Sequence, residues 1–335
     1  MRREHLSGVS VIIPTYNRAH DLKRCLESLL AQTLKPLEVI IVDDSSNDDT
    51  LNLVAQMRGS FHRRGIPLKY IKTRSKFKSL TRARNIGSKL AKGDILLFLD
   101  DDVVLSSNYI AEIHRSFEKC PQAMAAIGFI TNIHMSTLNN LLNRFFWLFH
   151  TSQNKAKLLV SLDSVYPTAD SSVEYLKCDL LTGNNMAIRK KVFKEGLKFD
   201  EKLLRYSWRE DHDFALSLKE RYGANPVCLA MNARLLHLRS SAGRIPSEKF
   251  ILIREAYQLY VFYKHGLDKK ALNNFIYWWS RFGFLIMLVI GGIKGNIRNR
   301  FKEAALTLKA LRYVISERNK IKRRDLGEIN KVFTG

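Results

Sequence analysis

Several patterns that mark whole classes of protein are missing from this sequence. Its cysteines, Cys25, Cys120, Cys178 and Cys228, are widely spaced and form no CxxC pair, which is typical of reduced core residues in a cytosolic protein. No GxGxxG follows the first apolar run, so a dinucleotide-dependent dehydrogenase is excluded. The opening "MRREHLSG" leads directly into an apolar run that is too short for a signal peptide. The sequence also has no internal repeat and no low-complexity linker.

Acidic residues are scarce relative to basic ones. The 335 residues include 55 Lys and Arg against 32 Asp and Glu, a formal net charge of +23. This excess indicates an anionic partner, and nucleic acid, an anionic bilayer and a phosphorylated substrate would each satisfy it. The hydrophobic fraction of 46% is typical of a globular core. The length accommodates one large domain with an appendage, or two domains.

The first hundred residues alternate between short β-branched runs and amphipathic stretches. We predict strands over four ranges, with helices between them: 9–13, 37–43, 68–73 and 94–100. This alternation predicts an α/β fold with a parallel sheet covered on both faces. Ligands of such sheets bind beyond the carboxyl ends of the strands. Polar residues follow three of these ends: Pro14 and Tyr16, then Asp44, then the triplet from Asp100 to Asp102.

The triplet Asp100, Asp101 and Asp102 directly follows an apolar run. Three adjacent carboxylates repel one another and resist burial. A solvated turn would explain them, and so would a site for a hard divalent cation such as Mg²⁺ or Mn²⁺, which takes oxygen ligands. In an extended segment residues i and i+2 point the same way, so Asp100 and Asp102 are expected to share one face.

Six segments together resemble the glycosyltransferases of family 2, which have the GT-A fold. They are "VSVIIPTYNR", "EVIIVDDSSNDDT", "TRARNIG", "GDILLFLDDDV", "TGNNMAIRKKVF" and "REDHDFALSL". They occur in the family's order and cover roughly residues 8 to 240. The resemblance implies a GT-A α/β fold, with a Rossmann-like and mostly parallel sheet flanked by helices. It also implies an inverting transfer from a nucleotide-sugar donor.

In this family the carboxylate cluster is the DxD motif. The resemblance implies that Asp102 ligates a divalent metal, Mg²⁺ or Mn²⁺, that bridges the donor's diphosphate. Asp100 and Asp101 would then contact the ribose or water in the metal shell. His237 occupies a position where the family frequently has a histidine near the metal or the diphosphate. A lone histidine packed in the core is the alternative for His237.

Further donor contacts are implied at the ends of the first two strands and at the "RARN" motif. Asp44 matches the residue that hydrogen-bonds the nucleotide base, commonly uracil, although an N-cap of the next helix is an alternative. Pro14 and Tyr16 occupy the loop that packs against the base in the family. Arg84 falls where family members contact the nucleotide.

Two later motifs match the segments that lie near the acceptor in this family. Gly183 and Asn184 resemble the segment that lines the junction of donor sugar and acceptor, although ordinary turn chemistry also explains them. Asp211 matches the general base that takes the proton of the acceptor hydroxyl, with Glu210 beside it. The alternative is that both acids merely favour the start of a helix, where the macrodipole stabilises negative charge.

The C-terminal third differs in character from the rest. It has 12 consecutive uncharged residues at 282–293, and from Arg281 to the end 13 Lys and Arg stand against 4 Asp and Glu. With the tryptophans Trp278 and Trp279, the apolar stretch 275–293 fits a helix that spans, dips into or lies on an anionic leaflet. A buried core helix is the alternative. The aromatic segment 138–152 leaves two alternatives as well, a core helix or a mobile segment that touches the membrane or gates the acceptor.

We therefore expect a GT-A catalytic domain at 1–245 and a basic, helical, membrane-associated region at 246–335. The catalytic domain would divide into a nucleotide-binding half, 8–105, and an acceptor half, 106–245.

The expected function is metal-dependent, inverting sugar transfer from a nucleotide donor, with UDP favoured, to a lipid-linked or polysaccharide acceptor of the cell envelope. The enzyme would sit on the cytoplasmic face of the membrane as a peripheral or monotopic protein and would bind no nucleic acid. The alternatives are a basic nucleic-acid-binding protein, for which no motif is present, and a non-catalytic relative that binds nucleotide-sugars.

Overall fold

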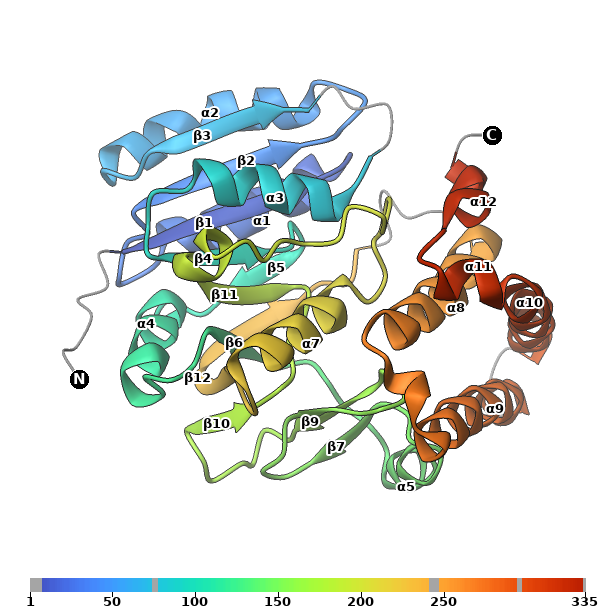
Figure 1. Ribbon diagram of the computed structural model, residues 1–335. Helices are drawn as coiled ribbons and strands as arrows, with labels where there is room; N and C mark the ends of the chain where they lie inside the picture. Colours follow the sequence, from blue (N-terminus) through green and yellow to red (C-terminus); the bar gives the residue numbers. More distant parts are fainter. Residues whose placement is uncertain (1–7, 74–77, 241–246, 294–296, 334–335) are drawn as a thin grey trace.

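A nine-stranded mixed sheet forms the centre of the computed structural model, which describes residues 8–73, 78–240, 247–293 and 297–333 (Figure 1). In chain order its strands are β1 (Val9–Thr15), β2 (Glu38–Asp43), β3 (Leu68–Lys72), β4 (Ile95–Leu99), β5 (Val103–Leu105), β6 (Ala125–Ile130), β10 (Tyr175–Cys178), β11 (Asn185–Arg189) and β12 (Val227–His237). Their spatial order is β10-β12-β6-β11-β4-β1-β2-β3, and β5 pairs with β12.

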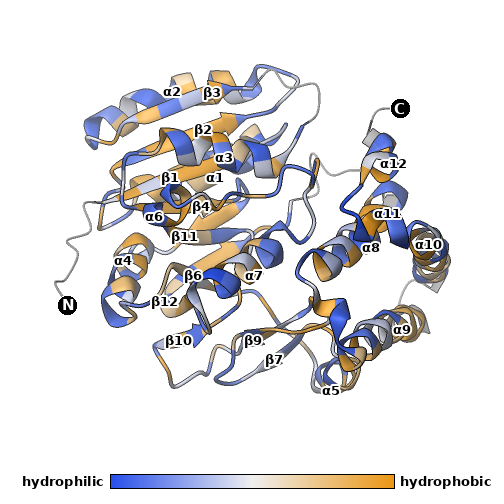
Figure 2. Ribbon diagram, viewed as in Figure 1, coloured by the Kyte–Doolittle hydropathy of each residue, from blue (hydrophilic) through white to orange (hydrophobic). Residues whose placement is uncertain are grey.

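The four strands predicted in the first hundred residues are confirmed, with ends shifted by at most two residues. Strands β1, β2 and β4 are buried along their whole length, as expected for apolar runs covered on both faces (Figure 2). β1 pairs in parallel with both β2 and β4, and β2 pairs in parallel with β3. Strands β1 to β4 therefore form the parallel sheet that the sequence predicts.

The order of these strands fixes where a ligand crevice opens. The chain steps outward from β1 through β2 to β3 and then returns to β4 on the other side of β1. Right-handed crossovers then place the returning helix on the face opposite to the first two helices. The helices of this part are α1 (Ala19–Leu30), α2 (Asp49–Arg63) and α3 (Leu80–Leu90), and Figure 1 shows α3 in front of the sheet. The crevice is expected beyond the carboxyl ends of β1 and β4, where the direction reverses.

The second half adds antiparallel strands to the same sheet. β11 pairs antiparallel with β4 and β6, while β12 pairs in parallel with β6 and antiparallel with β5. β11 is followed directly by the short helix α6 (Lys190–Lys194). The motif with Glu210 and Asp211 begins helix α7 (Glu210–Tyr222), which ends at Gly223. Helix α4 (Tyr109–Lys119) packs on β6 and β12.

The aromatic segment 138–152 is not a core helix, so that alternative was wrong. Its helix α5 (Thr137–Phe145) has no buried residue. The chain continues into a small separate sheet of β7 (His150–Ser152), β8 (Lys157–Leu158) and β9 (Ser164–Pro167). The exposed side chains of α5 therefore need another explanation.

The C-terminal region is helical, as predicted. Its elements are α8 (Ser247–Lys264), η1 (Leu267–Lys269), α9 (Ala271–Ile293), α10 (Ile297–Ser316), α11 (Arg318–Lys322), α12 (Gly327–Asn330) and η2 (Lys331–Phe333). Buried residues of α8 form a second apolar cluster with Leu162 and Leu203 of the preceding part. The boundary expected at 245/246 lies outside the described residues, so this division stays a prediction.

Helix α9 contains the predicted apolar stretch. Within the described part of the chain, the 21 residues Ala271–Gly291 of α9 form the one helix long and apolar enough to cross a membrane by length and composition. Only a third of this stretch is buried. Length and composition alone do not distinguish a spanning helix from one that lies on a surface.

Candidate active site

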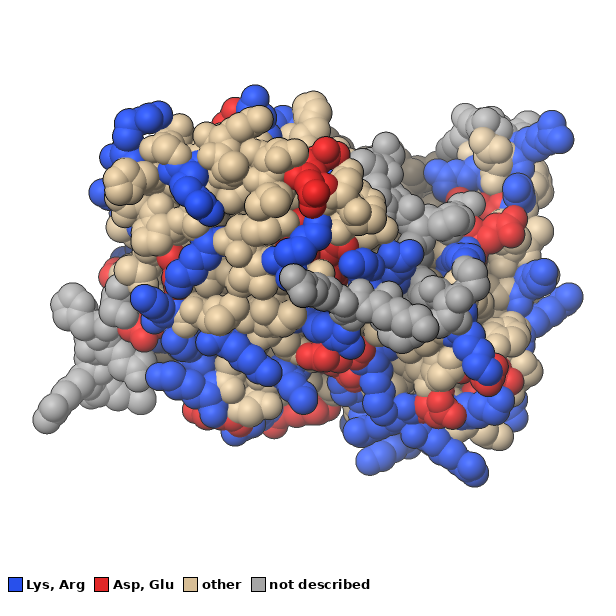
Figure 3. Space-filling model, turned by 90° about the horizontal axis from the view of Figure 1, so that it is seen from above, with Lys and Arg blue, Asp and Glu red and all other residues tan. Residues whose placement is uncertain are grey.

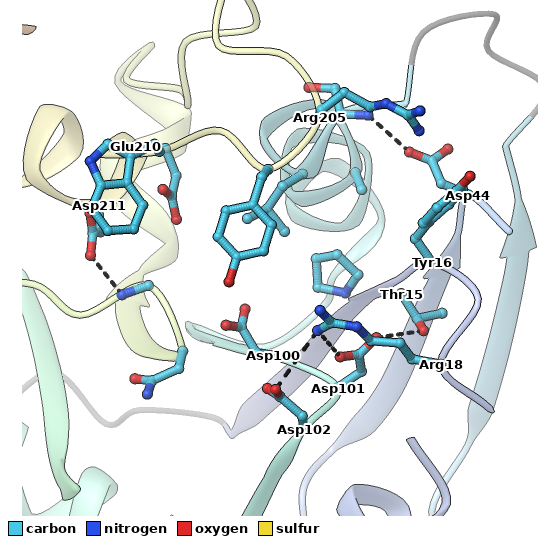
Figure 4. Close-up of a pocket in the computed structure, with 18 of the residues that line it drawn as sticks. Thr15, Tyr16, Arg18, Asp44, Asp100, Asp101, Asp102, Arg205, Glu210 and Asp211 are labelled. Atoms are coloured by element: carbon cyan, nitrogen blue, oxygen red, sulfur yellow. Dashed lines mark hydrogen bonds and ion pairs between the residues drawn. The ribbon is translucent and has the colours of Figure 1, made fainter. Parts of the chain in front are cut away.

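A cavity of about 310 Å³ opens beyond the carboxyl ends of β1 and β4, where the topology places a crevice. All of the predicted site residues except Arg84 line it. They are Pro14, Tyr16, Asp44, Asp100, Asp101, Asp102, Gly183, Asn184, Glu210, Asp211 and His237. Figure 4 shows that the labelled side chains come from several elements and face one space. The structure thus brings together residues that are far apart in the sequence.

The three carboxylates that follow β4 have two kinds of surroundings. Asp101 bonds to neighbouring side chains, whereas Asp100 and Asp102 lie beside His237. Asp101 is only 4% exposed, and it accepts hydrogen bonds from Thr15 Oγ1 at 2.8 Å and Arg18 Nη1 at 3.2 Å. Burial raises the pKa of Asp101 to about 7, although Arg18 and Thr15 oppose the rise. Asp100 and Asp102 join His237 in a separate group, so the alternation of an extended segment holds here.

Asp100, Asp102 and His237 form a group that fits a divalent cation. Their ligand atoms lie within 4.8 Å of one another, and His237 Nε2 is 3.2 Å from Asp102 Oδ1. Asp102 Oδ1 is buried and faces the His237 imidazole without a well-aligned hydrogen bond. Two carboxylates and an imidazole are suitable ligands for Mn²⁺ or a related metal. The donor set therefore fits the metal that the sequence motif implies.

Sheet pairing carries His237 to this position. The antiparallel pairing of β12 with β5 sets His237 opposite Val103, the residue after Asp102. The backbone N–H of Leu238 donates to the carbonyl oxygen of Asp102 at 2.8 Å, and that of Ser240 donates to Asp102 Oδ2 at 2.9 Å. Burial acts to raise the pKa of Asp102, but His237, Ser240 and Arg18 outweigh it and lower the pKa. Asp102 is thus held ionised, as a metal ligand must be.

Asp44 lies at the other end of the cavity and keeps one oxygen open. Its Oδ2 accepts a hydrogen bond from the backbone N–H of Ser79 at 3.1 Å. Its Oδ1 is buried without a hydrogen-bond partner among the described residues. Tyr16 lines the same cavity, and the Arg205 guanidinium lies 5.5 Å from the centre of the Tyr16 ring. An open carboxylate oxygen beside an aromatic ring is suited to an N–H donor of a planar base.

Arg84 does not reach the cavity. Its side chain is fully buried, and it binds Glu210 Oε1 at 2.5 Å, the carbonyl oxygen of Gly183 at 2.6 Å and Asp100 Oδ1 at 3.2 Å. The contact of Arg84 with the nucleotide stays a prediction, because the Arg84 side chain is buried against protein groups. The guanidinium instead joins three segments that line the cavity, so Arg84 acts through the residues that it holds.

Glu210 and Asp211 begin α7 on the far side of the cavity from Asp44 (Figure 4). The Gly183 N–H donates to Asp211 Oδ2 at 2.9 Å. A Cβ on Gly183 would lie 2.7 Å from Glu210 Oε1, so any larger residue here would displace the Glu210 carboxylate that binds Arg84 or the backbone at position 183. Burial and the neighbouring Asp211 carboxylate raise the pKa of Glu210, and Arg84 opposes the rise. The predicted base and its neighbour thus differ in environment, since Glu210 is buried against Arg84.

Asp163 connects the start of α7 to the C-terminal helices. Arg209, which precedes α7 with a φ of +70°, donates from Nη2 to Asp163 Oδ1 at 2.8 Å. Arg281 of α9 donates from Nη2 to Asp163 Oδ2 at 2.9 Å. Arg281 Nη1 also lies 3.6 Å from Glu255 of α8. We call Arg209, Asp163, Arg281 and Glu255 the buried ion chain.

Sequence reasoning missed several cations and aromatic residues of the cavity. Arg18, Lys78, Arg205, Tyr206, Trp208 and Arg209 all line it. Arg18 carried a usable signal, because a cation directly after the first strand must lie at the same sheet edge as the carboxylates. The others lie in loops whose positions depend on the whole fold.

Comparison with known proteins agrees with this geometry. The chain matches the family model described as "Glycosyl transferase family 2" over residues 10–197. An uncharacterized glycosyltransferase of Haemophilus influenzae is 29% identical over 223 residues, which cover 65% of this chain and 64% of that protein.

A second relative is named UDP-Glc:alpha-D-GlcNAc-diphosphoundecaprenol beta-1,3-glucosyltransferase WfaP, from Escherichia coli. It is 38% identical over 107 residues, which cover 32% of this chain and 40% of that protein. The matched stretches thus span less than two thirds of both relatives. Among solved structures, the mannosyltransferase PcManGT from Pyrobaculum calidifontis, in complex with GDP-Man and Mn²⁺, has a TM-score of 0.58 and 13% identity. The match covers 93% of this chain and 88% of that one, and it shows a shared GT-A fold.

Proposed function

The chain belongs to glycosyltransferase family 2, and we propose that it moves a sugar from a UDP-sugar to a lipid-linked or polysaccharide acceptor, with inversion at the anomeric carbon. One observation carries the proposal. A group that fits a metal, an open base-binding carboxylate and a candidate general base all line the same cavity. The reaction class follows from the family, and the roles below are our assignment.

The donor would bind along the cavity from Asp44 to Asp102. Asp44 Oδ1 would accept a hydrogen bond from the base, while Pro14 and Tyr16 would pack against its ring. Asp102, His237 and Asp100 would hold Mg²⁺ or Mn²⁺, which when bound neutralises charge that develops on the leaving diphosphate. The Escherichia coli relative is named for UDP-Glc and the Pyrobaculum structure holds GDP-Man, so UDP remains our preference rather than a property of the fold.

Asp211 would act as the general base. The Gly183 N–H bond fixes one of its oxygens, which orients the carboxylate at the cavity wall. Asp211 would take the proton of the acceptor hydroxyl as the hydroxyl oxygen attacks the anomeric carbon from the side opposite the diphosphate. The bond from that carbon to the diphosphate oxygen breaks, and the nucleoside diphosphate leaves. Glu210 and Asn184 would contact the sugar or the acceptor.

A membrane location at the cytoplasmic face is part of the proposal. The Escherichia coli relative is named for a diphosphoundecaprenol acceptor, and the apolar helix α9 with the basic segments after it suits an anionic leaflet. A cell-envelope polysaccharide is the product class that this acceptor chemistry favours. We keep the division into 1–245 and 246–335 as a proposal about which part performs transfer and which part holds the lipid.

Donor binding by calorimetry tests the proposal. UDP, GDP and dTDP would be titrated with and without Mn²⁺ into the native protein, Asp102→Ala, and the matched control Asp170→Ala, whose exposed carboxylate lies outside the cavity. We expect Mn²⁺-dependent binding of UDP that is lost in Asp102→Ala and kept in the control. Binding of none of the three nucleotides would remove the basis of the proposal.

A further inference from the structure

The most exposed apolar side chains gather on two helices that are far apart in the sequence. Among the residues that the structure describes, the large hydrophobic side chains that are more than half exposed all lie on α5 or α9. They are Leu138, Leu141, Phe145, Leu272, Phe275 and Phe282, with exposed fractions between 51% and 67%. Exposed apolar residues scattered singly are ordinary, but a gathered set indicates an interaction site.

Trp279 joins the two helices into one surface. Its ring centre lies 5.5 Å from that of Phe145 on α5, 6.1 Å from Phe275 and 5.7 Å from Phe282. Its indole N–H donates to the carbonyl oxygen of Phe145 at 3.1 Å. A Cβ on Gly283 would lie 2.2 Å from the Phe146 ring, so the end of α5 packs directly on the α9 backbone. We call Trp279 together with the six exposed residues the aromatic platform.

The spacing of these residues explains why they share a surface. On α9, Leu272, Phe275, Trp279 and Phe282 follow intervals of three, four and three residues, which place them on one helix face. Leu138, Leu141 and Phe145 repeat that pattern on α5. Each helix therefore presents an apolar stripe outward.

The opposite face of α9 is attached to the rest of the protein. Tyr277, Ser280 and Arg281 are buried, and the Tyr277 ring centre lies 4.4 Å from that of Phe262 on α8. Arg281 belongs to the buried ion chain. A helix that crossed the bilayer at this point would carry Arg281 toward hydrocarbon and away from Asp163 and Glu255, which is costly for a buried guanidinium. The attachment thus favours a helix that stays beside the fold.

Charge identifies what the platform faces. Helices α5 and α9 contain no Asp or Glu. Arg144 on α5 is exposed, and so are Lys269 and Lys270 directly before α9. Figure 3 shows the upper side of Figure 1, away from α5, and there too Lys and Arg cover more of the surface than Asp and Glu, so the basic excess extends over the molecule beyond the platform. Tryptophan and phenylalanine flanked by cations, without acids, are typical of helices that lie in the headgroup region of an anionic bilayer.

We infer that the aromatic platform rests on an anionic lipid surface, with α5 and α9 both lying on the bilayer and neither of them crossing it. This inference deepens the proposed membrane location and rests on it. It assigns α5, from the middle of the chain, to the same membrane contact as the C-terminal helix.

Vesicle flotation of the full chain tests the inference. The native protein would be compared with the triple variant Leu141→Ser, Phe145→Ser and Phe275→Ser. The matched control is Leu34→Ser, Leu51→Ser and Leu90→Ser, which removes leucines exposed by 40–46% outside the platform. Vesicles of phosphatidylcholine with about 30% phosphatidylglycerol supply the anionic surface, and pure phosphatidylcholine is the neutral comparison.

We expect native and control proteins to float with the anionic vesicles, and the platform variant to lose about tenfold or more in partition. Neutral vesicles should bind the native protein more weakly. Flotation of the platform variant at the native level would overturn the inference. So would vesicle binding that resists an alkaline carbonate wash, because that result indicates a spanning helix.

Sedimentation velocity of the same proteins separates lipid from a second copy of the chain. A native dimer that the platform variant converts to monomer, with no vesicle binding by either, would assign the surface to self-association and overturn the inference. UDP calorimetry on these samples distinguishes this failure from that of the proposed function. A protein that floats but binds no nucleotide contradicts the function alone, and one that binds UDP but not vesicles contradicts the platform alone.

Discussion

Buried carboxylates have different partners in the cavity and in the region where α7 packs against α8. In the cavity, Asp44 keeps one buried oxygen without a hydrogen-bond partner among the described residues, and the buried Asp102 Oδ1 faces the His237 imidazole, a group that can itself bind a metal. Where α7 meets α8, Lys264 lies 2.8 Å from both Asp200 and Asp213, and the Asp213 carboxylate also binds His265. Carboxylates that are left open can bind a ligand, whereas carboxylates that are fully paired hold elements together. Removing the first kind should change function, and removing the second kind should change stability.

The largest expected effect is on transfer in Asp211→Asn. The amide keeps the acceptor oxygen for the Gly183 N–H but cannot take a proton, so the rate should fall by about 10²–10⁴-fold. The measurement is the initial rate of UDP release from UDP-glucose with a polyprenyl-linked acceptor. UDP affinity should stay at the native value, as it should in the exposed control Asp170→Asn, and the free energy of unfolding should fall by about 1 kcal/mol, because the amide nitrogen cannot accept the bond that the His212 N–H now donates to Asp211 Oδ1. Native rates in Asp211→Asn would refute the assignment of the base.

The largest effect on stability is expected from Arg281→Met, which removes a cation that joins α9 to Asp163 and to α8. Asp163 keeps its pair with Arg209 and Glu255 keeps its pair with Arg254, but each carboxylate loses one buried cation, so the free energy of unfolding should fall by about 1–3 kcal/mol. Urea unfolding measures it. The control Arg144→Met removes an exposed arginine from α5 and should stay within about 0.5 kcal/mol of native. Equal stability of the two variants would show that the buried ion chain does not hold the layers together.

A smaller effect on transfer is expected from Gly183→Ala. The new methyl would meet Glu210 Oε1 and displace the backbone that positions Asp211, so the rate should fall by about tenfold to a hundredfold. UDP binding should be unchanged, because Asp44 and Asp102 are not touched. Gly59→Ala, on α2, adds the same methyl at a site where its nearest neighbour is 3.7 Å away and should transfer at the native rate. If the two variants behave alike, close packing at Gly183 has no role.

The smallest effect concerns the pH dependence of stability. Burial acts to lower the pKa of His265, but Asp213 and Glu220 outweigh it and raise the pKa above the ordinary value of 6.5. The stabilisation is therefore complete below that value and is lost as the pH rises through the folded pKa. Urea midpoints across this range should decline in the native protein and in the exposed control His62→Gln, and His265→Gln should flatten the decline. An unchanged slope in His265→Gln would assign the decline to other groups.

Local patterns made much of the fold predictable. The buried strands are apolar runs of five to seven residues, and amphipathic helices separate them, so the parallel sheet could be predicted. The sheet edge that carries Asp44 and Asp102 could then be predicted as well. The family motifs then nominated the residues that line the cavity. The roles of these residues stay predictions, since the geometry brings them together without testing them.

What sequence could not supply depends on long-range packing. Arg84 is buried by partners 126 and 99 residues away, so its place in a motif gave no sign that it would be withdrawn from the cavity. His237 reaches Asp102 only because β12 pairs with β5. The exposure of α5 likewise depends on α9, more than a hundred residues later, and composition alone left a core helix open.

The buried ion chain has a geometric consequence. It ties α9 through Arg281 and Asp163 to Arg209, the residue before Glu210 and Asp211. The helix with the aromatic stripe and the backbone with the proposed base are thereby joined by side-chain ion pairs. If α9 rests on a lipid surface, as we infer, these pairs fix the distance of the Asp211 carboxylate from that surface. Acceptors would then be selected by the distance of their reacting hydroxyl from the membrane as well as by side-chain contacts.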